Sequence, residues 1–273
     1  MLPLILLLAV PSVYSENFSY VFDGVRYSKQ SILSIKGLPT NLVANPNTED
    51  ILFTLIDIDT LQNDDVQTKM DQYILKNNEP IKIDNVNGQA AAVDIKYNRV
   101  YIASDHGLNI LNNTNKANFI ALLNEDITQL FKPQNNGKIY AVIYPDSEVY
   151  EIDLEKNEKV KVGIPCAFML AVDSRGNIFY ECDSKYVKVL LKDFQEPIEF
   201  VGIPKNSARA LTVDKNDRVI LAANDGLYWL KPNSVIPEKL MNLDFVPSGI
   251  AFLDDRFYLS TNGIIYEFEV SES

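Results

Sequence analysis

The feature that most constrains the fold is a sequence repeat of about 40 residues. Each copy reads as a short apolar strand, a turn rich in Asx and Gly, and a strand of β-branched and aromatic residues, as in 211–223 (LTVDKNDRVILAA). A second turn and two more strands complete the clearer copies, and four strands in this length are typical of one β-propeller blade. The six copies, aligned where the first strand ends, fall on Asn45, Asp94, Pro133, Asp173, Asp214 and Leu253.

Six copies predict an all-β fold, a six-bladed β-propeller of four-stranded blades. The sixth copy ends with its third strand, Gly263–Val270, and Ser31–Lys36 precedes the first copy, where the other copies have their outer strand. We therefore expect Ser31–Lys36 to complete the last blade and close the ring, which removes exposed sheet edges. Phe18–Phe22 reads as a further strand without a predicted place. No window carries a sustained helical period with caps, which disfavours an α/β barrel.

The N-terminus predicts secretion. The apolar run Leu4–Val10 is shorter than the roughly 20 residues that span a membrane, but it suits a signal peptide. Val13 and Ser15 would then precede cleavage before Glu16, which leaves residues 16–273 as one extracellular propeller domain. A buried first strand is the alternative interpretation of residues 1–15. The sequons at Asn17 and Asn112 add two predicted N-glycosylation sites.

The chain has two cysteines, and they flank a predicted hairpin. If the hairpin turn centres on Ser174, Cys166 and Cys182 face each other across the two strands. That geometry permits a disulfide, and an extracellular compartment permits it chemically. We predict this bond, with two unpaired buried thiols as the alternative.

Charge and missing motifs exclude several classes of function. Lys and Arg number 25 against 37 Asp and Glu, a formal net charge of −12, which argues against nucleic acid or an anionic membrane as the main partner. A single histidine excludes a multi-histidine metal centre. Gly-x-Ser-x-Gly, a phosphate-binding glycine loop and His-Glu-x-x-His are absent from the sequence. We expect a monomer that is not an enzyme and needs no metal or cofactor.

A ligand site is expected at one end of the central channel. The loops that enter the inner strands and those that join the second and third strands of each blade should meet there. Aromatic rings with few charges suit a planar organic ligand, and the fork of an arginine matches a carboxylate. Turn and ion-pair roles are the alternatives for the histidine and the arginine. The predicted ligand-binding residues are His106, Tyr144, Phe168, Arg209 and Phe245.

Other polar residues receive structural roles. Asp94, Asp173 and Asp214 end inner strands, where Asp commonly caps the following turn, so we expect caps there in preference to metal ligands. Trp229 is expected to pack within a blade. The insertion 57–68, with Asp57, Asp59, Asp64 and Asp65, is expected to be a solvated loop, with weak calcium binding as the alternative.

Blade segments such as 93–102 (VDIKYNRVYI) and 222–229 (AANDGLYW), with the signal sequence and acidic charge, resemble the ommochrome-binding proteins of lepidopteran haemolymph. The resemblance runs along the whole chain and involves no catalytic motif. It implies a secreted, non-catalytic haemolymph carrier of tryptophan-derived phenoxazinone pigments, and it transfers no binding residues.

Two alternatives remain for the function. The hairpin 172–178 (VDSRGNI) is similar to those of the gluconolactonase-type propellers, which hold calcium or zinc through Glu, Asp and Asn at the channel mouth. That alternative implies a metal-dependent hydrolase, for which Asn224 and Asp225 are the best ligand pair. A protein-binding propeller is the other alternative, and it predicts a large exposed apolar patch in place of a pocket.

Overall fold

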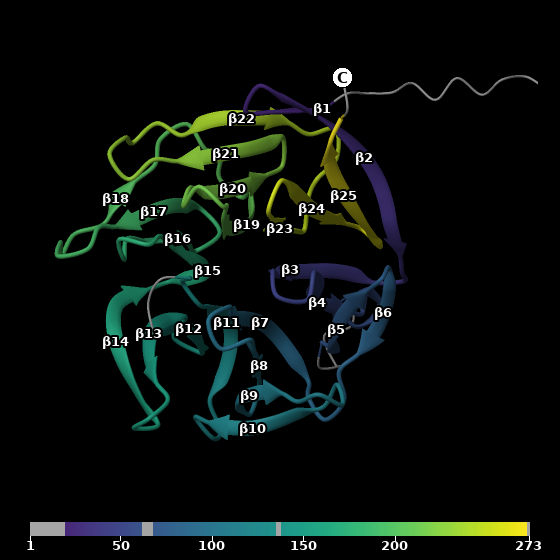
Figure 1. The fold of residues 1–273 in the computed structure, drawn as a ribbon. Coiled ribbons are helices and arrows are strands. Elements are labelled where there is room, and N and C mark those ends of the chain that lie inside the picture. The colour runs from purple at the N-terminus through teal and green to yellow at the C-terminus, as the bar shows by residue number, and fades with distance from the viewer. Residues whose placement is uncertain (1–19, 62–67, 135–137, 272–273) are drawn as a thin grey trace, which may run out of the picture.

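The computed structural model describes residues 20–61, 68–134 and 138–271, which form six antiparallel sheets around a central axis (Figure 1). The prediction of a six-bladed propeller is confirmed. Within blades 1 to 5 the strands are ordered as in the chain, from the axis outward. Blade 1 consists of β3 (Leu38–Asn45), β4 (Asp50–Ile56), β5 (Met70–Lys76) and β6 (Glu79–Lys82). Blade 2 consists of β7 (Gly88–Asp94), β8 (Arg99–Ser104), β9 (Gly107–Leu111) and β10 (Ala117–Ala121). Blade 3 consists of β11 (Asp126–Phe131), β12 (Ile139–Tyr144), β13 (Glu148–Asp153) and β14 (Glu158–Pro165).

The second half of the chain repeats this pattern and adds the closing strands. Blade 4 consists of β15 (Ala167–Val172), β16 (Ile178–Cys182), β17 (Tyr186–Leu190) and β18 (Ile198–Glu199). Blade 5 consists of β19 (Ala208–Val213), β20 (Val219–Ala223), β21 (Gly226–Leu230) and β22 (Glu238–Asn242). Blade 6 consists of β23 (Gly249–Leu253), β24 (Arg256–Thr261) and β25 (Ile264–Val270), together with β2 (Val25–Ser34) and β1 (Tyr20–Phe22).

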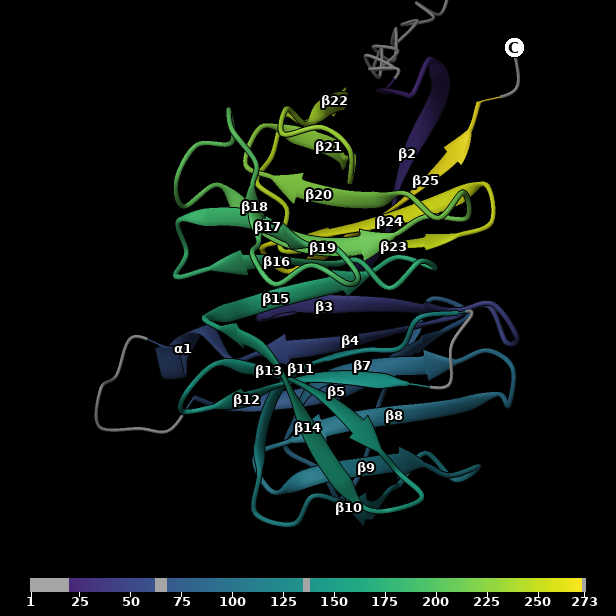
Figure 2. The ribbon, with the colours of Figure 1, turned by 90° about the vertical axis from the view of Figure 1, so that its left-hand side faces the viewer.

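The N-terminal strand closes the ring, as predicted. β2 pairs with β25 from Tyr27 opposite Val270 to Ser34 opposite Ile264, and the two strands lie side by side in both ribbon views (Figures 1 and 2). The strand starts earlier than expected, at Val25. The described part of the predicted strand Phe18–Phe22 is β1, which pairs with β2 as a fifth strand of blade 6; residues 18 and 19 lie outside the described residues. The proposed signal peptide and Asn17 lie outside the described residues.

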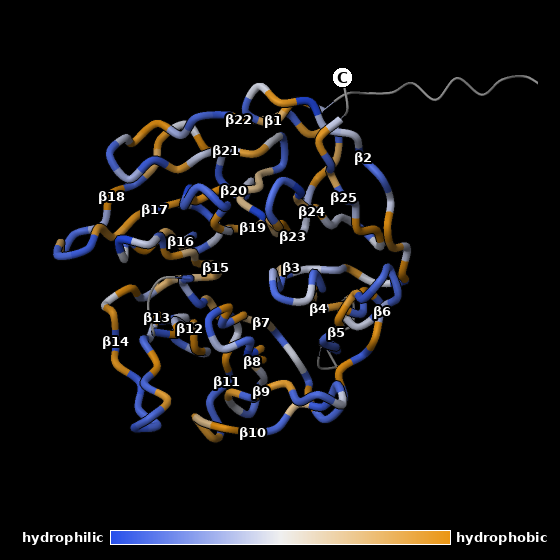
Figure 3. The backbone as a smooth tube through the Cα atoms, in the orientation of Figure 1, coloured by the Kyte–Doolittle hydropathy of each residue, from blue (hydrophilic) through white to orange (hydrophobic). Residues whose placement is uncertain are grey.

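The apolar core lies largely between the blades, because alternate residues of a strand face opposite neighbours. In β16, Tyr180 packs in a cluster with blade 3, whereas Phe179 packs in a cluster with blade 5. The apolar stretches follow the strands, and the peripheral loops are mostly hydrophilic (Figure 3). Trp229 packs in the cluster of blades 5 and 6, as expected. No helix among the described residues is long and apolar enough to cross a membrane.

The aspartates at the ends of inner strands cap turns, as expected. The Asp173 carboxylate accepts hydrogen bonds from the backbone N–H groups of Arg175 and Asn177. Asp214 accepts the equivalent bonds from Asn216 and Arg218, and Asp94 accepts one from Tyr97. Each inner strand of this kind therefore ends in a turn held by its own side chain.

The acidic insertion after β4 begins with the short helix α1 (Ile58–Leu61), which projects from one face of the ring (Figure 2). The Asp57 carboxylate accepts a hydrogen bond from the Asp59 N–H, and Asp59 pairs with Lys36. Asp64 and Asp65 lie outside the described residues.

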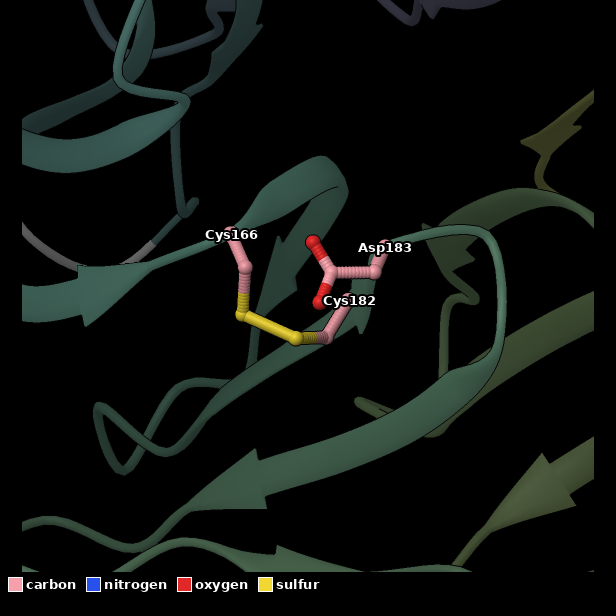
Figure 4. A group of neighbouring side chains, drawn as sticks. All are labelled: Cys166, Cys182 and Asp183. Atoms are coloured by element: carbon pink, nitrogen blue, oxygen red, sulfur yellow. A yellow bond between two sulfur atoms is a disulfide. The ribbon is translucent and has the colours of Figure 1, made fainter.

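The predicted disulfide is confirmed, although the hairpin register differs from the expected one. Cys166 and Cys182 are bonded, with their Cα atoms 4.9 Å apart (Figure 4). The turn centres one residue later than predicted, so Val172 faces Ile178. An irregularity in the pairing then places Ala167, and not Cys166, opposite Cys182. The bond still forms because Cys166 directly precedes β15.

Candidate ligand site at the channel mouth

Two connected cavities occupy the axis of the ring. The first, here called the channel, has a volume of about 250 Å³ and is lined by the inner strands. The second, here called the side pocket, has a volume of about 280 Å³ and opens where the inner strands begin, at what we call the upper mouth. Asn41, Gln129 and Phe168 line both cavities, so the channel and the side pocket meet at these side chains.

The upper mouth is built by β-bulges. The inner strands of blades 1 to 5 each break register with their second strand near their start, whereas β23 of blade 6 pairs regularly. A bulge re-aims the side chain of its extra residue, and bulges are common beside active sites. Every bulge contributes a residue that lines the channel or the side pocket. These residues are Asn41, Gln89, Thr128, Phe168 and Arg209.

A hydrogen-bonded set of amides forms one side of the mouth. Asn41 has a positive φ of 49°, a conformation that Asn tolerates better than most residues. Its Nδ2 donates to the Gln89 carbonyl at 2.7 Å, and its Oδ1 accepts from Gln129 Nε2 at 3.1 Å. Gln89 Nε2 donates to the Asp126 carboxylate at 2.5 Å. These bonds join blades 1, 2 and 3 and fix the orientation of each amide.

Arg209 supplies the positive charge on the opposite side of the mouth. Its side chain is exposed and lines the channel, and its Nε donates to Asn224 Oδ1 at 2.6 Å. Asp225 is bonded instead to Tyr228 and to Lys239 Nζ, and this lysine lowers the pKa of Asp225. Asn224 and Asp225, the ligand pair that the metal alternative requires, are therefore both engaged by other side chains.

Two of the predicted aromatic residues lie at the mouth with exposed rings. Phe168 lines both cavities and is 51% exposed, and Tyr144 lines the side pocket and is 60% exposed. Exposed aromatic rings beside a cavity offer flat apolar faces to a ligand. The structure thus brings Tyr144, Phe168 and Arg209 to the same two connected cavities.

The other two predicted residues lie elsewhere. Phe245 is partly buried in the cluster of blades 5 and 6, where it packs on Tyr266 and beneath Lys29 Nζ. The His106 side chain is 81% exposed and lies 3.9 Å from the Asp105 carboxylate. Neither residue lines the channel or the side pocket. Packing explains this, because the Phe245 ring is taken into the apolar cluster and the His106 side chain projects into solvent from the loop between β8 and β9.

A buried carboxyl lies next to the disulfide. Glu181 is 3% exposed, and its Oε1 has no hydrogen-bond partner among the described residues. Burial, and secondarily the charge of Asp183, raises the pKa of Glu181 to about 7. The registers place Ala103, Val142 and Ala222 at the same position of blades 2, 3 and 5, so this acid occupies an otherwise apolar position.

The residues of the mouth do not fit a divalent metal. Calcium takes six to eight oxygen ligands, usually including several carboxylates, and zinc takes His, Cys or carboxylate ligands. The bulge side chains contain no carboxylate and one is a cationic guanidinium, while the carboxylate beside them, that of Asp126, accepts a hydrogen bond from Gln89. Among the described residues, the one cluster of potential ligands is Cys166, Cys182 and Asp183, whose sulfur atoms are joined as a disulfide (Figure 4). No chemical step is therefore assigned to a metal.

Comparison with known proteins identifies the fold. No protein-family model matches the sequence, and a sequence search matches no curated protein. Solved structures do match. A gluconolactonase of Xanthomonas campestris is 8% identical, with a TM-score of 0.71 and 94% of this chain and 96% of that one covered. Regucalcin of Agrobacterium tumefaciens, a calcium-binding protein, is 11% identical, with a TM-score of 0.66 and coverages of 89% and 94%.

These neighbours contradict the expectation that the protein is not an enzyme, because a fold of this length and topology is used by gluconolactonases. A luciferin-regenerating enzyme matches as well, at 12% identity and a TM-score of 0.62, with 89% of this chain and 95% of that one covered. The absence of familiar catalytic motifs does not exclude an enzyme, since propeller sites are assembled from single residues of several blades. The likeness establishes that this chain shares the propeller fold of gluconolactonase and regucalcin.

Proposed function

We propose that the protein is a secreted hydrolase of the lactonase type that acts on a small organic molecule at the upper mouth. The observation that carries the proposal is the convergence of five bulge side chains on two connected cavities. The likeness to gluconolactonase supports the reaction class. Lactone hydrolysis needs a group that stabilises the negative charge developing on the carbonyl oxygen and a base that activates water.

Two side chains can take these roles. Arg209 is the cation of the mouth, and it would stabilise the oxyanion and then the carboxylate of the product. Asp126 would accept a proton from the attacking water, because its carboxylate is held at the rim by the pocket-lining Gln89. The amides of Asn41 and Gln129 would orient the polar groups of the substrate.

A lactone panel tests this proposal. The purified protein should release acid from at least one aliphatic or aromatic lactone, measured by continuous pH-stat titration. Arg209→Gln and Asp126→Asn should each lower kcat/KM by about 100-fold or more. Arg175→Gln is the matched control, because Arg175 lies in a turn at the other end of the inner strand and is paired with Asp173. Full activity in both site variants, or no turnover of any lactone, would overturn the proposal.

Binding of a planar aromatic pigment is a second candidate function. The exposed rings of Tyr144 and Phe168 beside the side pocket favour it, since they offer stacking surfaces for a flat ligand. A phenoxazinone such as the ommochromes would place its carboxylate on Arg209. Titration with a phenoxazinone carboxylic acid should shift the visible absorbance of the dye and quench protein fluorescence. An unchanged spectrum at millimolar dye would reject this candidate.

Secretion is part of the proposal and is supported by the disulfide, since such bonds persist mainly in oxidising compartments. Asn112 lies in the turn between β9 and β10, where its Oδ1 accepts hydrogen bonds from the N–H and Oγ1 of Thr114. A full-length chain expressed in insect cells should appear in the medium without residues 1–15, and Asn112→Gln should remove one glycan. Retention of the chain inside the cells would argue against secretion.

A further inference from the structure

The bulge side chains are neutral or positively charged, which is the opposite of what a cation-binding site requires. These five positions surround the mouth at the same level of their strands and present two amides, a hydroxyl, a phenyl ring and a guanidinium. The amide oxygen of Asn41 already accepts a hydrogen bond from Gln129. The five bulge side chains together carry one positive charge, that of Arg209, in a chain whose total is −12, and the Asp126 carboxylate lies on the other side of the mouth, where it accepts a hydrogen bond from Gln89. Beside Arg209 a divalent cation would meet repulsion, whereas an anion would meet attraction.

Arg209 lines the channel and differs in its partners from the three arginines of the ring that form ion pairs. Arg175, Arg218 and Arg256 each form an ion pair with Asp or Glu. Arg209 forms no ion pair with a described carboxylate, and its Nε is bonded to the neutral amide of Asn224. A neutral partner keeps the positive charge available. Because that bond engages Nε, the two terminal nitrogens remain for a bidentate carboxylate.

We infer that the upper mouth is a carboxylate-binding site in which Arg209 replaces a metal ion, so that ligand binding needs no divalent cation. The carboxylate docks on the terminal nitrogens of Arg209, and the rest of the ligand lies against Phe168. Asn224 is a positioning residue that fixes the plane of the guanidinium through Nε. This inference deepens the proposed function and rests on it only for the location of the site.

Calorimetric titration with two matched probes tests the charge preference. 2-Naphthoate carries the carboxylate, and 2-naphthamide is its neutral counterpart of the same shape. The protein should bind naphthoate more tightly than naphthamide by about tenfold or more. Arg209→Gln should abolish that preference and leave naphthamide binding unchanged, whereas the control Arg175→Gln should behave as the parent protein. Equal affinity for both probes in the parent protein, or no binding of naphthoate at millimolar concentration, would overturn the inference.

The positioning role of Asn224 has its own variant. Asn224→Asp keeps the shape of the side chain but places a carboxylate next to Arg209, where it competes with the ligand for the guanidinium. Naphthoate affinity should fall by about tenfold or more while naphthamide affinity and the melting temperature stay unchanged. A fall for both probes together would indicate a purely structural role for Asn224 and count against the inference.

Metal titration completes the test and separates it from the proposed function. Calcium and zinc chloride should not raise the melting temperature, and EDTA should not change naphthoate affinity. Calorimetric binding of calcium or zinc at the mouth, lost in Asp126→Asn or accompanied by tighter naphthoate binding, would overturn the inference even if lactones are hydrolysed. Absence of lactone turnover with metal-independent naphthoate binding would instead reject the hydrolase and leave the inference standing.

Discussion

Phe168 and Phe245 show how position decides the role of a residue type. Phe168 is 51% exposed at the mouth, whereas Phe245 packs against Tyr266 and Lys29 in the cluster of blades 5 and 6. The Lys29 ammonium lies 4.7 to 5.1 Å from the centroids of three aromatic rings, those of Tyr20, Phe245 and Tyr266. Such contacts stabilise the fold and are remote from the channel.

The two phenylalanines are therefore expected to respond oppositely to truncation. Phe168→Ala should weaken binding of any aromatic ligand at the mouth, by on the order of 1 kcal/mol, with little change in stability. Phe245→Ala should lower the free energy of unfolding by about 1–3 kcal/mol and leave ligand affinity unchanged. Urea unfolding and calorimetric titration of both variants measure the two effects. Loss of binding in Phe245→Ala alone would place the site away from the upper mouth.

Glu181 makes stability depend on pH. Its pKa of about 7 in the folded protein lies above its ordinary value of 4.5, so between these values the folded chain holds a proton that the unfolded chain lacks. The free energy of unfolding should therefore fall as the pH rises from about 5 to about 8, by on the order of 2–3 kcal/mol.

Glu181→Gln checks this contribution, because it keeps the shape and removes the charge. The variant should be more stable than the parent protein at pH 8 and nearly equal to it at pH 5, as measured by urea unfolding at each pH. Identical pH profiles for the two proteins would show that the Glu181 carboxyl is hydrated or paired in solution.

Among the elements, the inner strands show what the sequence alone could predict. The repeat correctly placed six blades, the closing strand and the loops around the upper mouth, because turn chemistry and strand composition are local signals. It did not identify Asn41, Gln89 or Thr128, because a bulge is a mismatch between two strands and leaves no compositional signal.

The repeat alignment nevertheless contained a usable signal. Gln89, Thr128, Phe168 and Arg209 each stand five residues before the aligned strand end of their own copy, at Asp94, Pro133, Asp173 and Asp214. Equivalent positions of a propeller face the same axis, so this one column predicts the ring of the mouth. His106, Phe245 and Tyr144 lie outside the column, and of these three Tyr144 alone lines a cavity, from the end of β12.

The disulfide links two elements at this mouth. It joins the residue before β15 to the last residue of β16, with a sequence separation of 16. Closing a loop of this length stabilises a protein by about 3 kcal/mol in the chain-entropy model. The double variant Cys166→Ser, Cys182→Ser should lose about 2–4 kcal/mol in urea unfolding, and Phe168, two residues after Cys166, should bind ligand less tightly. Unchanged stability would contradict this contribution.

At the scale of the whole molecule, polar contacts between turns at the end of the ring opposite the upper mouth join neighbouring blades. Asn47 donates to the Ile95 carbonyl between blades 1 and 2, Ser174 donates to Asp217 between blades 4 and 5, and Arg256 pairs with Glu49 between blades 6 and 1. The exposed pairs among them each contribute little. Continuity of the ring therefore depends mainly on the apolar clusters between blades and on the strand that closes blade 6.

Removal of the closing strand should open the ring. β2 covers β25 with a ladder from Tyr27 to Ser34, and the buried Leu33 packs in the cluster that joins blades 6 and 1. A variant lacking residues 20–34 leaves β25 as an unpaired edge, a template for association with other chains. We expect it to aggregate or to form oligomers, as measured by size-exclusion chromatography with light scattering, and to have a lowered melting temperature.

The matched control lacks only β1, residues 20–22, and retains β2; it should remain as monodisperse as the parent protein. If the longer deletion stays monodisperse with an unchanged melting temperature, closure of the ring does not depend on β2, and the contacts between the other blades hold it closed.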